Sequence, residues 1–139
     1  MKDSITLTAP DGHSFEAYLA TPAGTPKAAV VVIQEIFGVN AHIKEVADRF
    51  AAAGYLVIAP ALFDRVAPDI TLAYDGDGVA EGRGLKDQAD ANGEFDVKAA
   101  IDHVASSGAV GVVGFCWGGS HPSKSQQRQP PQKLSLIHI

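Results

Sequence analysis

Two apolar runs constrain the fold of this chain more than any other feature. Residues 28–33 and 109–113 are short, apolar and rich in valine, and neither alternates with polar residues as a half-exposed strand does. Runs of this kind indicate strands buried on both faces, as in parallel sheets covered by helices. With the amphipathic helical patterns that lie between them, they predict an α/β fold with a mostly parallel sheet.

The segments around the first run supply further elements of such a fold. Residues 4–9 and 14–20 alternate polar and apolar on either side of a Pro-Asp-Gly-His turn, which predicts an N-terminal β-hairpin. Apolar residues at helical spacing after Asn40 predict a helix that ends at Gly54. Residues 55–59 predict another short apolar strand.

The stretch before the second run predicts a long loop and two helices. Residues 60–80 are rich in Asp, Gly and Pro, and we interpret them as a surface excursion. Residues 81–92 predict a polar helix that contains Gly82 and Gly84. Residues 94–107 carry apolar residues on one face and predict an amphipathic helix.

Composition excludes several classes of protein. The chain has 139 residues, which suits one domain, and 11 basic against 16 acidic residues give a net charge of −5. Nucleic acid requires a basic surface, so it is not an expected partner. The chain has no run of about 18 apolar residues and no apolar signal core, so neither a membrane nor secretion is expected. One cysteine and five histidines form no disulfide and no zinc pattern, which predicts a cytoplasmic protein without a metal.

A glycine-flanked cysteine follows the second apolar run. Residues 114–119 read Gly-Phe-Cys-Trp-Gly-Gly, with a glycine two positions before and two after Cys116. This is the cysteine form of a nucleophile elbow, a sharp strand-to-helix turn that holds a nucleophile above the sheet. A buried structural thiol is the alternative interpretation of Cys116. A dinucleotide-binding turn is excluded, because the glycine spacing is wrong.

The residues now quoted resemble a known family. Residues 11–13, 32–40 and 111–119 are similar, in order and spacing, to segments of the dienelactone hydrolase family, a branch of the α/β-hydrolases. The resemblance covers roughly residues 1–120, the N-terminal part of a family member. It implies an α/β-hydrolase fold and hydrolysis of lactones or small carboxylic esters through a cysteine-bound acyl intermediate. It implies no cofactor and no partner other than a small-molecule ester or lactone.

The resemblance also implies roles for individual residues. Cys116 matches the nucleophile, and Glu35 matches a carboxylate that helps to ionise the thiol. The backbone N–H groups of Ile36 and Trp117 match the oxyanion hole, the pair of donors that stabilises the tetrahedral intermediate. Glu35 has an alternative reading, in which its carboxylate merely anchors the loop after the strand.

Two substrate contacts are weaker expectations. Phe37 could line the acyl pocket, and a plain packing role is equally compatible with its position. Arg83 could correspond to the family's arginine that grips a substrate carboxylate. The residues around Arg83 match the family poorly, and a solvated charge on a helix is the alternative.

The last segment departs from the family pattern. Residues 121–139 contain three bases, no acid and three prolines, where a helix should support the elbow. We expect a family-like domain over residues 1–120, followed by a non-family tail over 121–139. The tail is interpreted as a frameshift, a cloning scar or sequencing read-through, with a genuine disordered tail as the alternative.

The departure bears on activity and on folding. No Asp or Glu follows Cys116, and His121 and His138 have no acid partner in the order that a hydrolase triad requires. The chain is therefore expected to be an inactive, truncated hydrolase. The strand at 109–113 is expected to have a bare apolar edge. Two rival functions stay open: a non-catalytic fragment with a reactive thiol, and a related small-substrate carboxylesterase.

Overall fold

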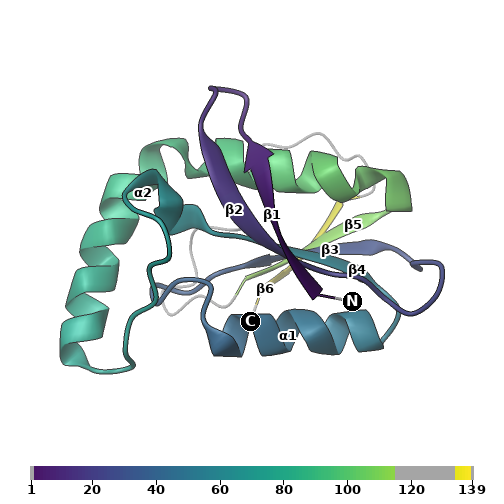
Figure 1. The fold of residues 1–139 in the computed structure, drawn as a ribbon, viewed down its shortest axis with the longest axis horizontal. Helices are drawn as coiled ribbons and strands as arrows, with labels where there is room; N and C mark the ends of the chain where they lie inside the picture. The colour runs from purple at the N-terminus through teal and green to yellow at the C-terminus, as the bar shows by residue number, and fades with distance from the viewer. Residues whose placement is uncertain (1, 115–133, 139) are drawn as a thin grey trace.

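A six-stranded sheet forms the centre of the molecule. The computed structural model describes residues 2–114 and 134–138, and Figure 1 shows their arrangement. The strands follow the spatial order β1-β2-β4-β3-β5-β6. Their bounds are β1 Lys2–Thr8, β2 Ser14–Ala20, β3 Ala29–Ile33, β4 Leu56–Pro60, β5 Val110–Gly114 and β6 Leu134–His138.

The pairing of the strands confirms the predicted architecture. β3 lies between β4 and β5 and runs parallel to both, and β6 runs parallel to β5. β1 and β2 form the predicted N-terminal hairpin, and β2 joins the sheet antiparallel to β4. The sheet is therefore mostly parallel with an antiparallel hairpin at one edge, as an α/β-hydrolase fold requires.

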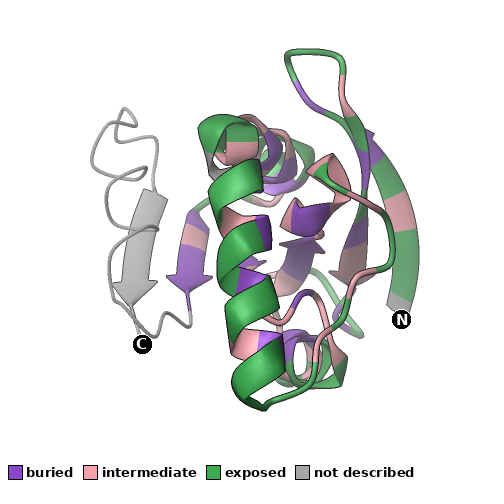
Figure 2. Ribbon diagram, turned by 90° about the vertical axis from the view of Figure 1, so that its left-hand side faces the viewer, coloured by how far each residue is buried: buried purple, intermediate pink, exposed green. Residues whose placement is uncertain are grey.

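Helices cover the two faces of the sheet, which explains why β3 is apolar throughout. α1 (Ala41–Ala52) and α2 (Gly76–Val104) lie on opposite sides of it (Figure 1). Val30 and Val32 pack in the cluster that contains α1 residues, whereas Val31 packs in the cluster that contains Ala100 and Val104 of α2. Figure 2 shows the resulting buried strands behind α2. Successive strand residues point to opposite faces, so a strand between two helical layers needs an apolar residue at every position.

The prediction of two helices in the second half was wrong. One helix, α2, runs from Gly76 to Val104, and two short 3₁₀ turns flank it at Leu62–Arg65 (η1) and Ala105–Ser107 (η2). α2 begins within the expected loop because the Asp75 side chain accepts a hydrogen bond from Gly78 N at 2.7 Å, which caps the helix. Figure 1 shows that α2 changes direction along its length. Its first part packs against η1, and its last part packs against the sheet.

The expectation of a bare edge at β5 was also wrong. β6, from the end of the chain, pairs with β5 over five residues, from Val110↔Leu134 to Gly114↔His138. Three of the five residues of this segment are aliphatic (Leu134, Leu136 and Ile137), and isoleucine favours strands. Backbone groups of β5 that would otherwise face solvent are therefore paired.

An arginine fork connects the hairpin turn with α2. Arg65 of η1 donates to the Asp11 carboxylate at 2.7 and 3.0 Å, and to the Asp96 carboxylate at 2.7 and 3.0 Å. The hydrogen bond from Arg65 lowers the pKa of Asp11 to about 2. Burial raises the pKa of Asp96, against the opposing effect of Arg65. The two carboxylates hold the pKa of Arg65 above its ordinary value, so the guanidinium stays charged at any physiological pH.

A small residue on α2 allows the helix to approach the loop after β3. A Cβ atom at Gly82 would overlap the carbonyl oxygen of Ile36. Gly84, two residues further on, has open space around the corresponding position. Gly82 is therefore required for packing, whereas Gly84 only weakens the helix.

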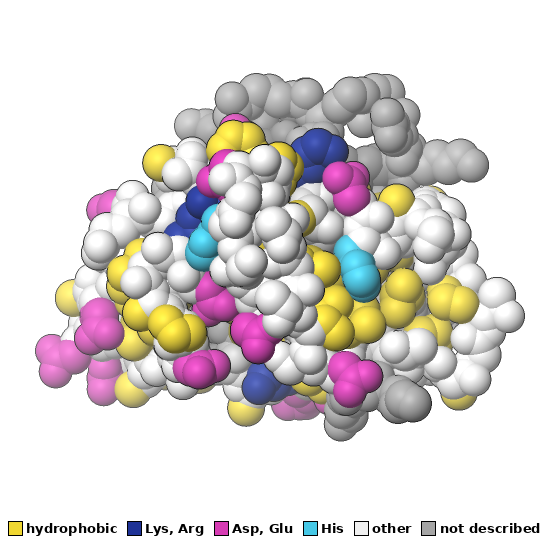
Figure 3. Space-filling model, turned by 45° about the horizontal axis from the view of Figure 1, so that its top comes forward, with side chains coloured by type: hydrophobic (Ala, Val, Ile, Leu, Met, Phe, Trp, Pro, Cys, Tyr) yellow, Lys and Arg dark blue, Asp and Glu magenta, His cyan; other side chains and the backbone are white. Residues whose placement is uncertain are grey.

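Acidic side chains dominate the charge on the surface seen in Figure 3. Magenta Asp and Glu side chains are spread over this face, and dark-blue Lys and Arg side chains occupy few places on it. The distribution agrees with the net charge of −5. On this face, the described part of the chain offers no broad basic surface of the kind that binds nucleic acid.

The arginine fork predicts a large loss of stability for Asp96→Ala. The Asp96 side chain is fully buried, and its removal leaves Arg65 without one of its two partners. Breaking such a buried pair costs about 3 kcal/mol. Asp102→Ala is the matched control, because Asp102 forms an exposed pair with Lys98 at 3.0 Å and should cost at most about 0.5 kcal/mol. Urea unfolding measures both, and equal losses would contradict the proposed importance of the fork.

The close approach of α2 predicts opposite effects for two glycine substitutions. Gly82→Ala should lower the free energy of unfolding by about 1–3 kcal/mol, because its methyl group meets the Ile36 carbonyl. Gly84→Ala should raise that free energy by about 0.5–1 kcal/mol, because alanine is the better helix former. Thermal or urea unfolding of the two variants provides the comparison. Stabilisation by both substitutions would show that α2 does not contact the loop closely.

Candidate active site

The carboxyl ends of β3 and β5 meet at one edge of the sheet. The last residues of the two strands, Ile33 and Gly114, are paired in the parallel ladder. Glu35 follows two residues after Ile33. The elbow residues Cys116 and Trp117 lie outside the described residues, and their predicted roles stay predictions.

Hydrogen bonds of the Gln34 side chain and of the backbone hold the loop after β3. The Glu35 carbonyl oxygen accepts from Gly38 N at 3.3 Å and from Gln34 Nε2 at 3.2 Å. Gln34 Oε1 accepts from Leu62 N, at the start of η1, at 2.8 Å. The buried Gln34 side chain therefore joins this loop to the segment that follows β4.

The Glu35 side chain meets a tyrosine from a distant part of the chain. Tyr74 Oη donates to Glu35 Oε1 at 3.5 Å, a long and weak hydrogen bond. Asn40 Nδ2 donates to Tyr74 Oη at 2.9 Å, and Asn40 also caps α1 by accepting from Ile43 N at 3.1 Å. Asn40 could have been found in the sequence as an N-cap residue, whereas no sequence signal marks Tyr74.

A strap formed by residues 70–74 packs against the loop after β3. Phe37 and Tyr74 meet edge to face with ring centres 4.4 Å apart, and Leu72 N donates to the Phe37 carbonyl oxygen at 3.0 Å. Gly38 has a φ of +87°, and a Cβ atom there would overlap the carbonyl oxygen of Ile70. Only glycine combines this backbone conformation with this contact, so the strap and the loop depend on Gly38.

Ile36 and Arg83, two further predicted site residues, differ in their exposure to solvent. Ile36 is buried with 4% exposure, and Gly82 of α2 lies against its carbonyl oxygen. Arg83, the next residue of α2, is exposed to solvent. Among the contacts of the described residues, none joins the Arg83 side chain to Glu35 or Phe37. Its role in gripping a substrate carboxylate stays a prediction.

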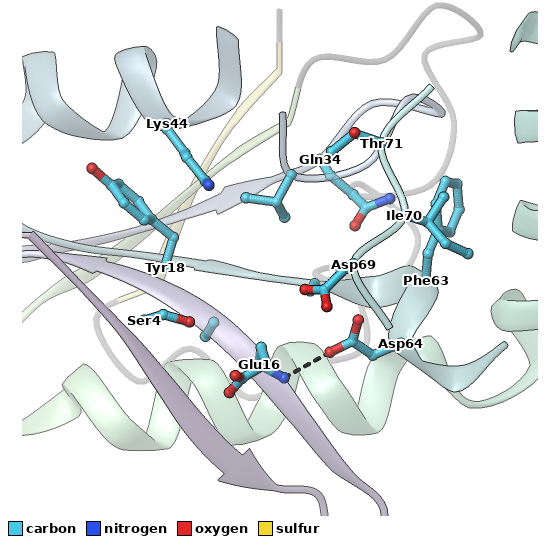
Figure 4. A pocket seen from close by; sticks show the side chains of 13 residues that line it. Ser4, Glu16, Tyr18, Gln34, Lys44, Phe63, Asp64, Asp69, Ile70 and Thr71 are labelled. Carbon is cyan, nitrogen blue, oxygen red and sulfur yellow. Dashed lines mark hydrogen bonds between the residues drawn. The ribbon is translucent and has the colours of Figure 1, made fainter. Parts of the chain in front are cut away.

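A pocket of about 290 Å³ opens beside this loop, on its β2–β4 side. Figure 4 shows Gln34, Lys44 and the carboxylates of Asp64 and Asp69 around it. Asp64 Oδ2 accepts from Glu16 N at 2.8 Å, and burial raises the pKa of Asp64. Glu35 is not one of the described residues that line this pocket. Carboxylates and the ammonium group of Lys44 therefore line the same pocket.

The described part of the chain holds neither a membrane-spanning helix nor a cluster of metal ligands. None of its helices combines the length and hydrophobicity needed to cross a bilayer. Its His, Cys, Asp and Glu side chains include no group of three or more that could hold a metal ion.

The amino-acid sequence matches a known family over most of its length. The pattern of the dienelactone hydrolase family covers residues 15–132. Carboxymethylenebutenolidase from Pseudomonas putida is 36% identical over 126 residues, which cover 86% of this chain and 53% of the relative. Carboxymethylenebutenolidase 1 from Cupriavidus pinatubonensis is 33% identical over 132 residues, which cover 86% of this chain and 54% of the relative. The chain spans about half the length of these curated relatives.

Solved structures share the fold described above. The structure of m3DLH superposes on this chain with a TM-score of 0.74 and 26% sequence identity. The match covers all of this chain and 58% of the m3DLH chain. A dienelactone-hydrolase-like promiscuous phosphotriesterase from metagenomic libraries superposes with a TM-score of 0.71 at 22% identity, which shows the same fold. The matching pattern and the shared fold together establish that this chain belongs to the dienelactone hydrolase family.

Proposed function

We propose that this chain carries the nucleophile and the oxyanion-binding half of a hydrolase that acts on lactones or small carboxylic esters. Cys116 attacks the acyl carbon, and Glu35 accepts the thiol proton. The N–H groups of Ile36 and Trp117 stabilise the oxyanion of the tetrahedral intermediate. Collapse of this intermediate breaks the acyl C–O bond and leaves a thioester on Cys116. The departing alkoxide takes up the proton held by Glu35, and the resulting alcohol is released from an ester or stays attached to the acyl group of a lactone.

One observation carries the proposal: the register of β3 and β5. Ile33 pairs with Gly114, and Glu35 and Cys116 each follow their strand end by two residues. Neighbouring strands in a sheet lie about 4.8 Å apart. Glu35 and Cys116 are each two residues beyond this pair. This equal spacing supports placing the carboxylate and the thiol side by side at the carboxyl ends of the two strands.

Hydrolysis of the thioester is proposed to be slow in this chain. Deacylation needs a base that activates water, and in α/β-hydrolases an acid and a histidine that follow the nucleophile provide it. No Asp or Glu follows Cys116 in this sequence. We therefore propose rapid release of one alcohol per chain, followed by little turnover.

An activated aryl ester tests the nucleophile. Mixing the chain with p-nitrophenyl acetate should release about one equivalent of p-nitrophenol in a burst, followed by a slow phase, because acylation outpaces deacylation. Cys116→Ala should abolish the burst. Mass spectrometry should find the acetyl group on Cys116, the chain's single cysteine. Identical time courses for the two proteins would rule out a catalytic thiol.

Alkylation by iodoacetamide tests the role of Glu35. The rate for Glu35→Gln at pH 7 should fall about tenfold, because an unassisted thiol is only a few per cent thiolate at that pH. Glu45→Gln is the matched control, since Glu45 is an exposed glutamate of α1 that pairs with Arg49 at 2.6 Å. Its rate should equal that of the unmodified chain. An unchanged rate for Glu35→Gln would assign Glu35 to anchoring the loop instead.

A further inference from the structure

The Gln34 side chain spans two elements that the backbone does not connect directly. It is the last residue before Glu35 and is only 9% exposed. Its Oε1 atom accepts from Leu62 N at 2.8 Å, and its Nε2 atom donates to the Glu35 carbonyl oxygen at 3.2 Å. Both ends of the amide are therefore engaged with backbone groups, one on η1 and one in the loop.

The contact with the Glu35 carbonyl determines the direction of the Ile36 N–H. These two groups belong to the same peptide unit, and the peptides of the described residues include no cis bond. In a trans peptide the carbonyl and the N–H point in opposite directions. Since Gln34 Nε2 and Gly38 N both hold the Glu35 carbonyl, rotation of this peptide would break two hydrogen bonds.

We propose that Gln34 is a positioning residue that keeps the Ile36 N–H directed at the oxyanion. The inference rests on the proposed function, in which that N–H is one of the two oxyanion donors. Leu62 supplies a fixed anchor, because η1 directly follows β4 of the sheet. Gly82 of α2 limits movement of the loop from the other side, where it lies against the Ile36 carbonyl.

Two reactions of the same thiol separate this role from a general structural one. Acylation of Cys116 by p-nitrophenyl acetate passes through a tetrahedral oxyanion, so its rate depends on the oxyanion donors. Alkylation by iodoacetamide displaces iodide at a saturated carbon and forms no oxyanion. A residue that orients only an oxyanion donor should therefore affect the first reaction and not the second.

Gln34→Glu and Gln34→Met provide complementary changes. The glutamate keeps an acceptor for Leu62 N and removes the donor to the Glu35 carbonyl, whereas the methionine removes both contacts without adding charge. Gln88→Glu and Gln88→Met are matched controls, because Gln88 Nε2 donates to the Gly84 carbonyl oxygen at 3.3 Å on the exposed face of α2. Circular dichroism and urea unfolding identify any variant that fails to fold.

The expected result is a selective loss of acylation. Both Gln34 variants should acylate about tenfold more slowly, less than the loss from removing an oxyanion donor outright, and their alkylation rates should change by less than about twofold. Both Gln88 variants should match the unmodified chain in both reactions. Equal losses in acylation and alkylation, or unchanged acylation in the Gln34 variants, would overturn the inference. Absence of Cys116-dependent acylation in the unmodified chain would instead remove the proposed function, and the inference with it.

Discussion

The position of β3 between two parallel neighbours is the constraint on which the rest of the structure depends. Its residues pack against helices on both faces and hydrogen-bond to β4 and β5 on both edges. The first four residues of the strand are buried, and Ile33 at its end is partly buried. Once β3 is central, the chain leaving it must emerge between the ends of β4 and β5. The loop that carries Glu35 is therefore placed by the packing of the strand before it.

Much of the fold follows from patterns that are local in the sequence. The hairpin, the apolar strands and α1 each have a periodicity or a cap that a short window contains. α2 is the informative exception, because it contains five glycines, three of them beyond its first turn at 82, 84 and 93, which oppose a helix that tertiary contacts nevertheless stabilise. Leu85 and Ala89 pack against Phe63 in a small cluster, and Ala100 and Val104 pack against the sheet. Burial of these residues outweighs the local preference of the glycines.

The candidate site was only partly predictable for a related reason. Glu35 and Ile36 were identified by resemblance, since they stand at a fixed distance from a recognisable strand. Their partners come from far along the chain: Leu62 is 28 residues from Gln34, and Tyr74 is 39 residues from Glu35. Those contacts depend on the path of residues 61–75, which carries no regular periodicity. Side chains that hold a loop in place are therefore visible only once the fold is known.

The arginine fork couples the unfolding of the hairpin to that of α2. Arg65 bridges a turn near the N-terminus and a helix residue 31 positions further on, and the Asp96 carboxylate it holds is fully buried. Displacing either the hairpin or α2 leaves charges in the interior with incomplete compensation. The two elements therefore resist separate detachment and should open as one cooperative unit. The protected amides of the hairpin and of α2 should therefore exchange together, although β1 is an edge strand of the sheet.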